Sequence, residues 1–564
     1  MTLASASEQS VFKSADKPRF EPVLQSRAMR VVIAVLLIAL LALGLRIGWL
    51  QKHTGIIEHE GAYYARLGEN LATGVGWIGL HFEGEQFFYS PGYPLLIAPV
   101  RLIVRDAEFA GRLVSLAFGS ALVVAVFLLA SDLYDRRVGY LAAALVALHP
   151  VLVGMSTTVN SEPTYFCLLF AGVFFVRRAV TSRRRWCAVV SGILLGLGYL
   201  TRAEALLIAT IGIFWVLISG WKKQRLASAQ LAGLLLAAFA FVASPYVLYL
   251  AKSTGQFHLE AKSASNFAYG QMILSGKSSS EANFGIDPDL TPRGLDMRTS
   301  LEVLRTTKVK PTSVVRFLLG GIRRNGKALI GGLLTNKAIG GVPLMALVAL
   351  GLFGTAWNAN RAANEVFLFA LFVCLVVPLF SLIFFDDRYL VVFLIPLIIW
   401  AAKGLTELSN WSGETARTLG LNQGLIASTQ AVIVLFATAT LFALTWQGVK
   451  EFAPLVSEDA ALRLVGQEMK DRFPPRPRIL DTGPYIAFYS GGTYGPFPFC
   501  DEETALKFIR TQNVDFLILR QNRGADLSYY NKWEREGIPD PKAHLILQTE
   551  TRNHERISVY RWAG

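Results

Sequence analysis

The chain has 564 residues, of which 53% are hydrophobic and 17% are charged, and its mean hydropathy is +0.41. A chain this long and this apolar is not a water-soluble globular protein, and the composition indicates many membrane spans. The formal net charge is +14. In membrane proteins, Lys and Arg gather in cytoplasmic loops and near lipid phosphates, so this charge does not indicate a nucleic-acid partner.

The first apolar segment follows a polar and basic stretch. Residues 1–30 carry several Lys and Arg, and the run 31–50 follows without a small-residue cleavage site, so we expect a tail and a retained first span. A span needs about 20 apolar residues. On this basis eleven spans are predicted, at 31–50, 108–131, 138–155, 161–176, 187–201, 203–220, 228–250, 338–357, 365–384, 389–403 and 425–447.

Basic residues in short loops predict the orientation. Loops rich in Arg or Lys at 134–137, 177–185 and 222–225, together with Arg361, fall on one side of the membrane. By the positive-inside rule, that side is the cytoplasmic one, and the N-terminus lies on it. We expect the protein in the inner (plasma) membrane. The apolar stretch 92–104 is short, and counting it as a span would put the basic loops on alternating sides. We therefore expect a juxtamembrane helix at the outer surface there.

Three segments are predicted outside the membrane on the outer face: the loops 51–107 and 251–337, and the tail 450–564. In the tail, polar helical patterns alternate with short β-rich runs, which predicts a small extracytoplasmic α/β domain. Its expected helices are 459–473 and 501–512, and its expected strands are 478–481, 514–520, 545–550 and 556–562. The predicted division is thus a cytoplasmic tail 1–30, a membrane domain 31–449 and an outer domain 450–564.

Charged residues from distant parts of the chain fall at the outer ends of the predicted spans. They are Glu58, His59, Glu60, Glu162, Arg202, Glu204, Asp386, Asp387 and Arg388. Charges near a bilayer are costly unless they are hydrated, paired or used in function. Each one taken alone is explained by a solvated anchor, whereas their gathering on one face favours a reaction centre.

Two stretches of the first outer loop carry a family pattern: "EGAYYARLGENLATGVGW", which begins at Glu60, and "FFYSPGYPLLIAPV", which ends at Val100. They resemble the corresponding loop of multi-span glycosyltransferases of the GT-C fold, in the branch of protein O-mannosyltransferases and the lipid A aminoarabinose transferase. Similar motifs follow at 161–170, 192–207, 244–259 and 386–402. The resemblance implies an inverting enzyme that moves a sugar from a polyprenyl phosphate to a hydroxyl of a lipid, glycan or protein at the outer membrane surface.

The resemblance also implies roles for three acidic residues. Glu60 stands where the family has its general base, usually Asp, and Gly61 replaces the usual second acid. Glu58 could compensate for that loss or could itself be the base. Glu162 matches an acidic residue of the second outer loop that helps to organise the acceptor or the base. The competing explanation for both Glu60 and Glu162 is a carboxylate in the first turn of a helix, where the helix dipole favours it. For Glu60 we prefer the role of base, whereas for Glu162 the two explanations stand level.

Four cations are candidates for contact with the donor phosphate: Arg388, Arg202, Lys262 and Lys252. A guanidinium offers forked donors to phosphate oxygens. Arg388 has a competing explanation as a local pair with Asp386 or Asp387, and Arg202 as a pair with Glu204. For the lysines the competing explanation is snorkelling to the membrane interface.

Tyr63, Tyr64 and Tyr93 are candidates for stacking on the sugar or the prenyl chain, although an interfacial aromatic belt explains them as well. A divalent cation held by Glu58 and Glu60 is possible, because paired carboxylates suit hard ions. No cofactor is otherwise indicated, and no Walker loop or GxGxxG motif supports nucleotide chemistry.

Two other functions fit a polytopic chain with a few buried charges. A transporter or lipid flippase would have many spans, but transporters often show two corresponding halves and charges near the midplane. This sequence shows neither. A non-catalytic GT-C partner in cell-envelope assembly is the other alternative, and it would explain the departures at Glu60 and Gly61.

Overall fold

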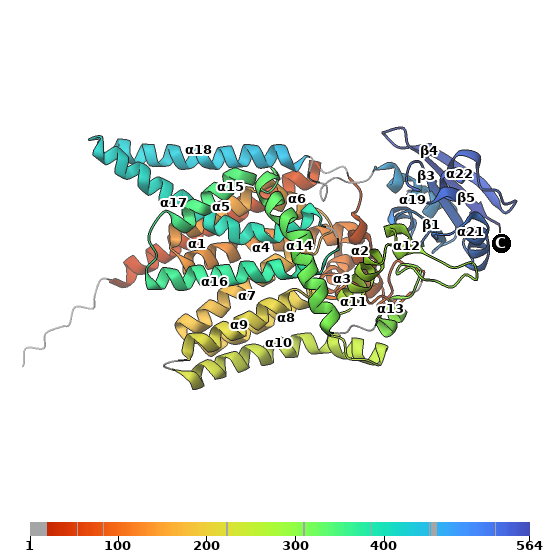
Figure 1. Ribbon diagram of the computed structural model, residues 1–564. Coiled ribbons are helices and arrows are strands. Elements are labelled where there is room, and N and C mark those ends of the chain that lie inside the picture. The colour runs from red at the N-terminus through yellow and green to blue at the C-terminus, as the bar shows by residue number, and fades with distance from the viewer. Residues whose placement is uncertain are drawn as a thin grey trace, which may run out of the picture.

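The computed structural model describes residues 20–52, 55–82, 84–221, 224–307, 311–383, 385–450, 452, 459–524 and 526–563. A bundle of long helices forms one part, and a small α/β domain lies beyond one end of it (Figure 1). The bundle consists of α1 (Phe20–Lys52), α4 (Ala107–Leu133), α5 (Arg136–Leu148), α6 (Pro150–Met155), α7 (Glu162–Ser182), α8 (Arg185–Thr201), α9 (Ala205–Gly220), α10 (Arg225–Thr254), α15 (Gly341–Phe353), α16 (Ala359–Val376) with η1 (Val377–Ser381), η2 (Asp387–Phe393) leading into α17 (Leu394–Thr418), and α18 (Gln423–Val449).

Each predicted span coincides with one of these helices or with two consecutive ones. In the described part of the chain, seven helices are long and apolar enough to cross a membrane, and α8, α9 and α15 are shorter apolar helices. The predicted span 138–155 is broken into α5 and α6 at His149, because Pro150 has no N–H to continue the helix. Helix α1 begins at Phe20, inside the predicted tail, and residues 1–19 of that tail lie outside the described residues.

Helix α17 is the centre of the bundle. Its first half is buried on all sides, and α15 crosses it at close range. A Cβ atom at Gly351 would overlap the carbonyl oxygen of Trp400, and one at Gly404 would overlap that of Leu347. Small residues thus let the two backbones touch, as is typical of helix pairs in membranes.

Several short helices and one longer helix cover the end of the bundle that faces the α/β domain (Figure 1). They are α2 (His59–Ala72), α3 (Gly92–Val104), α11 (Lys262–Leu274), α12 (Ser279–Phe284), α13 (Ser300–Thr306) and α14 (Pro311–Thr335). Helix α3 is the expected short helix at 92–104, and it packs on α2 and α4. The last four occupy the predicted loop 251–337, for which the sequence analysis predicted no helices.

The C-terminal domain has a five-stranded sheet with strand order β2-β1-β3-β5-β4. Strand β1 is parallel to β2 and β3, whereas β5 is antiparallel to β3 and β4. The elements are α19 (Ala461–Arg472), β1 (Arg478–Asp481), α20 (Tyr485–Tyr489), β2 (Thr493–Pro496), α21 (Glu502–Thr511), β3 (Phe516–Arg520), α22 (Ser528–Glu536), β4 (Ala543–Glu550) and β5 (Arg556–Trp562). All four predicted strands and both predicted helices are present.

A buried polar cluster joins the domain to the bundle. Glu108 of α4, 7% exposed, accepts hydrogen bonds from Arg112 at 2.5 Å, from Arg463 at 2.8 Å and from the Tyr489 hydroxyl at 2.8 Å. The backbone N–H of Ile57 donates to the same tyrosine hydroxyl at 2.9 Å. The domain is therefore held on the segment that leads directly into α2.

Candidate active site

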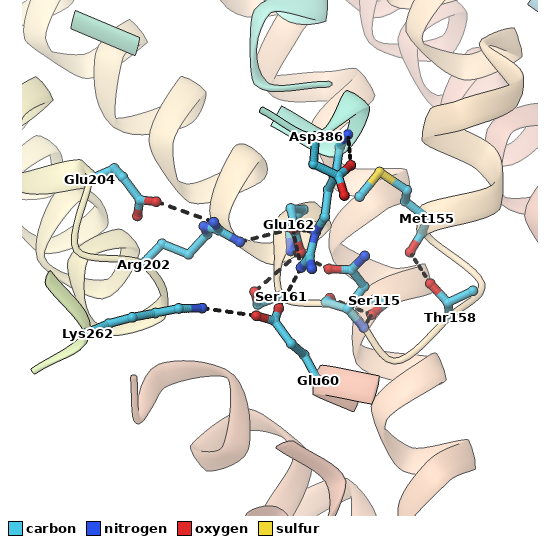
Figure 2. A network of polar contacts seen from close by, with 12 residues as sticks. Glu60, Ser115, Met155, Thr158, Ser161, Glu162, Arg202, Glu204, Lys262 and Asp386 are labelled. Carbon is cyan, nitrogen blue, oxygen red and sulfur yellow. Dashed lines mark hydrogen bonds and ion pairs between the residues drawn. The ribbon is translucent and has the colours of Figure 1, made fainter. Parts of the chain in front are cut away.

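Glu60 lies in the first turn of α2, where its negative charge is favoured by the helix dipole. One carboxylate oxygen accepts a hydrogen bond from the Lys262 ammonium at 2.9 Å, and the other accepts one from the Arg388 guanidinium at 2.7 Å (Figure 2). The side chain is 26% exposed. Three segments separated by hundreds of residues, α2, α11 and η2, therefore meet at this carboxylate.

Arg388 connects Glu60 to a second carboxylate. Its guanidinium contacts Glu162 at 2.6 Å, while Asp386 accepts a hydrogen bond from the Arg388 backbone N–H at 2.8 Å. Asp386 thus caps the start of η2. The Arg388 guanidinium pairs with Glu60 and Glu162, which are distant in sequence, and not with its neighbour Asp386 as the sequence allowed. Arg202, between α8 and α9, adds an ion pair to Glu162 at 2.9 Å and one to Glu204 at 3.3 Å.

The cluster alternates in charge, with three cations and three carboxylates in contact (Figure 2). Burial of Glu60 raises its pKa, but Arg388, Lys262 and Arg202 outweigh this effect and hold the pKa well below its usual range. In turn, the Glu60 carboxylate raises the pKa of the Lys262 ammonium. Glu60 is therefore ionised, and its charge is already neutralised by cations.

Glu58 lies beside this cluster in a different environment. One of its carboxylate oxygens accepts a hydrogen bond from the Val159 N–H at 3.0 Å, and burial raises its pKa to about 7. A Cβ atom at Gly61 would lie 3.2 Å from the Glu58 carboxylate and 2.8 Å from the Val159 carbonyl oxygen. The absence of a side chain at Gly61 thus lets the Val159 backbone, which donates to Glu58, lie against the first turn of α2.

The possible divalent-cation site does not fit this arrangement. Both oxygens of Glu60 are occupied by cationic side chains, and Glu58 is bonded to the backbone of Val159. Within the described ranges, no group of three or more His, Cys, Asp or Glu side chains is placed to hold a metal ion.

Glu60 and Arg388 line a cavity of about 590 Å³ between the bundle and the C-terminal domain. The bundle side includes Glu58, Glu60, Tyr64, Asn160 and Arg388, and the domain side includes Tyr485, Arg520, Arg523, Glu555 and Arg556. Glu162 is 5% exposed and contacts the cavity residue Arg388. The cavity therefore presents a carboxylate, Glu60, and a guanidinium, Arg388, to the same space.

The remaining candidates are placed differently. Tyr64 lines the cavity, but Tyr93 is fully buried and its hydroxyl donates to the Gly111 carbonyl oxygen at 2.8 Å, which favours a packing role. Tyr63 is 4% exposed and stacks on Tyr89. Lys252 is exposed in the last turn of α10, and among the described residues it contributes none of the ion pairs of the cluster.

The domain side of the cavity was missed by sequence reasoning. Arg520 is the last residue of β3, the most buried strand of the sheet, Arg523 follows that strand, and Arg556 begins its partner β5. The only available signal was the position of these arginines at strand ends, which becomes informative only when the order of the strands is known.

Comparisons with known proteins place this geometry in context. A model of the family described as dolichyl-phosphate-mannose-protein mannosyltransferase matches residues 89–249. The apo oligosaccharyltransferase of Archaeoglobus fulgidus is similar with a TM-score of 0.60 at 14% identity, covering 90% of this chain and 71% of that chain. The complex of AglB from the same organism with an inhibitory peptide and a dolichol-phosphate gives 0.59 at 13% identity, covering 94% and 74%.

A third similar structure is apo ArnT from Cupriavidus metallidurans, with a TM-score of 0.54 at 12% identity, covering 95% of this chain and 98% of that chain. A comparison with curated protein sequences gives no significant match. The structural likeness confirms the expected GT-C fold, a multi-span helical bundle with a small C-terminal α/β domain, and the family match confirms the resemblance stated from the sequence motifs.

Proposed function

We propose that the chain is an integral-membrane, inverting glycosyltransferase that moves a sugar from a polyprenyl-phosphate donor to a hydroxyl acceptor at the extracytoplasmic face. The observation that carries this proposal is the shared position of Glu60 and Arg388 on one cavity, joined at 2.7 Å. A carboxylate and a guanidinium are the base and the phosphate contact that this reaction needs. The family match at 89–249 and the AglB complex with a dolichol-phosphate support a lipid-linked donor.

In the proposed reaction, the acceptor oxygen attacks the anomeric carbon of the sugar from the face opposite the phosphate. The new carbon–oxygen bond forms as the bond to the phosphate oxygen breaks, and the configuration inverts. Glu60 takes the acceptor proton, and the electron pair leaves with the polyprenyl phosphate. Arg388 and Lys262 stabilise the departing phosphate, because charge-assisted hydrogen bonds strengthen as negative charge develops.

Donor binding would also activate the base. Lys262 and Arg388 contact the Glu60 carboxylate at 2.9 and 2.7 Å, and they hold its pKa low. A phosphate that takes hydrogen bonds from the same two cations competes with Glu60 for them. The pKa of Glu60 then rises, and its carboxylate becomes a stronger base when the donor is in place.

Glu162 and Arg202 act in this scheme as positioning residues. Glu162 contacts Arg388 at 2.6 Å and Arg202 at 2.9 Å, so it fixes the guanidinium of Arg388 against the cavity. The Glu204 carboxylate also contacts the Arg202 guanidinium, at 3.3 Å. This support limits the number of rotamers that Arg388 can adopt when the donor phosphate arrives.

Glu58 is the alternative base. Its pKa of about 7 makes it partly ionised near neutral pH, which suits proton transfer. Glu60 is preferred because it contacts the two cations that would hold the donor phosphate, whereas Glu58 contacts the backbone of Val159. Variants of each residue separate the two assignments.

The proposed topology puts the cavity outside the cytoplasm, with residues 1–30 as a cytoplasmic tail and residues 31–449 as the transferase domain. The extracytoplasmic domain would be residues 450–564. The basic short loops at 134–137, 177–185 and 222–225 support this orientation. The acceptor would be a lipid, glycan or protein of the cell envelope.

The test is turnover by purified protein in nanodiscs with a panel of polyprenyl-phosphate sugars and envelope extracts as acceptors. The proposal predicts release of free polyprenyl phosphate that depends on both donor and acceptor. In closed proteoliposomes with the same donors, movement of the intact donor between leaflets without cleavage would identify a flippase. No cleavage with any donor, combined with a stable association with another envelope enzyme, would identify a non-catalytic partner.

A further inference from the structure

The C-terminal domain presents the ends of three strands to the cavity. Arg520 is the last residue of β3, Tyr485 follows β1, and Arg556 begins β5. Strands β1 and β3 are parallel neighbours and β5 is antiparallel to β3, so these residues gather at one edge of the sheet. In open α/β sheets, ligands bind outside the carboxyl ends of parallel strands, where the strand order reverses. The order β2-β1-β3 puts such a point between β1 and β3.

Three arginines occupy this edge, each beside a carboxylate. Arg520 lies 3.9 Å from the Asp481 carboxylate and Arg523 lies 3.8 Å from that of Glu555. Arg556 lies 3.6 Å from the Glu534 carboxylate and also donates a hydrogen bond to the Glu534 carbonyl oxygen at 2.7 Å. The pairs that join Glu60 and Glu162 to their cations are shorter, at 2.6 to 2.9 Å. A guanidinium has five N–H donors, so each arginine can keep its carboxylate neighbour and still bind an added anion.

The acidic residues on the domain side do not cancel this charge. The Asp459 carboxylate accepts hydrogen bonds from the backbone N–H groups of Ala461 at 2.7 Å and Arg552 at 3.0 Å, so it serves as a cap. Glu555, the other acid of the domain that lines the cavity, pairs with Arg523 at 3.8 Å. Asp481 and Glu534, the neighbours of Arg520 and Arg556, are not among its lining residues, so the described lining of the domain side has three arginines and two carboxylates. The domain side of the cavity therefore favours a negatively charged group.

We infer that the edge formed by Arg520, Arg523 and Arg556 binds an anionic group of the acceptor, a phosphate or a carboxylate, while the acceptor hydroxyl lies at Glu60. This inference rests on the proposed function. The donor is assigned to the other side of the cavity, because its prenyl chain stays in the membrane and its phosphate meets Arg388 on the bundle. A cavity of about 590 Å³ has room for a sugar-sized group between the two sides.

The test is binding of small probes to the full chain in nanodiscs of neutral phosphatidylcholine, with no donor present. The probes are glucose 6-phosphate, glucuronate, short-chain phosphatidic acid and neutral methyl glucoside, titrated by calorimetry. Arg523 and Arg556 are 39% and 36% exposed, so Arg523→Gln and Arg556→Gln leave the core intact. The matched control is Arg472→Gln, which removes a 60% exposed arginine paired with Glu468 outside the cavity.

We expect at least one anionic probe to bind about tenfold tighter than methyl glucoside, as one charge-assisted contact provides. This preference should fall about tenfold in each cavity variant and stay unchanged in Arg472→Gln. A preference for phosphatidic acid identifies a lipid headgroup, and one for glucose 6-phosphate or glucuronate identifies an acidic glycan. Equal binding of neutral and anionic probes would overturn the inference. So would a preference that is lost in Arg388→Gln but kept in both domain variants.

These results are independent of the proposed reaction, because no donor is present. Loss of the anion preference together with normal polyprenyl-phosphate release would remove this inference alone. Anion binding as expected, without release from any donor, would remove the proposed function and leave an anion site on the domain.

Discussion

Replacement of Arg388 by Gln tests the phosphate contact most sharply, because the structure predicts a large loss of activity with a small loss of stability. The guanidinium contacts Glu60 at 2.7 Å and Glu162 at 2.6 Å. After the change, Glu60 keeps Lys262 at 2.9 Å and Glu162 keeps Arg202 at 2.9 Å. Neither carboxylate is left without a cation, so the cost of about 3–5 kcal/mol for an uncompensated buried charge does not apply.

Activity should fall much more than stability. A hydrogen bond between charged groups is worth about 1.5–3 kcal/mol, which corresponds to a loss of about 10- to 150-fold in turnover. Arg388→Lys keeps the charge but loses the fork that joins two groups, and we expect an intermediate loss.

The assay is release of polyprenyl phosphate from a labelled donor by protein in nanodiscs, with the thermal unfolding midpoint measured on the same samples. Wild-type turnover by a folded Arg388→Gln protein would refute the assignment. A variant that loses activity only because its unfolding midpoint collapses would show that the account of its stability is wrong.

Three further predictions follow from the same contacts. If Glu60 is the base, wild-type kcat/KM should show no loss as pH falls from 8 to about 5.5, because the pKa of Glu60 lies well below its usual range; half-loss near pH 7 would indicate Glu58 instead. Gly61→Ala should lower turnover at least about tenfold and cost about 1–3 kcal/mol in unfolding free energy, because the new Cβ meets Val159; Gly233→Ala, in open space, is its control. Glu108→Gln should loosen the C-terminal domain, measured by faster proteolysis near α19, since Arg463 loses its 2.8 Å partner; unchanged cleavage would show that the ion pair does not hold the domain.

The membrane spans could be predicted because the hydrophobicity that places a helix in the membrane is a property of a short, continuous stretch of sequence. Each predicted span coincides with one helix or with two consecutive ones, since a run of about 20 apolar residues has few alternatives in lipid. The break between α5 and α6 depends on the single residue Pro150. A hydropathy average over about 20 residues does not detect one proline, so the break was not predicted. The helices of 251–337 were missed because α11 to α13 are short and mix polar with apolar side chains. The longer α14 carries Arg316, Arg323, Arg324 and Lys327 within its apolar run, so its sequence does not predict a span.

The residues of the proposed site could be named from the sequence, but their contacts could not. Topology and motif resemblance selected Glu60, Glu162 and Arg388, and the structure places their side chains in contact. The pairing of Glu60 with Lys262, 202 residues away, depends on tertiary packing that charge alone does not specify. At Gly61 the sequence indicated only a lost acid, whereas in the structure a side chain there would overlap the Val159 backbone that donates to Glu58. Sequence alone could not reveal that a β1–β3 edge faces the cavity.

The central claim is that Glu60 is the base, and single-turnover release of polyprenyl phosphate by Glu60→Gln and Glu58→Gln tests it most directly. Gln at position 60 keeps the size of the side chain but cannot accept the acceptor proton. We predict that Glu60→Gln abolishes release at saturating donor, while the protein stays folded and still binds polyprenyl phosphate, and that Glu58→Gln retains most of the wild-type rate. Wild-type release by Glu60→Gln, or abolition by Glu58→Gln alone, would contradict the account.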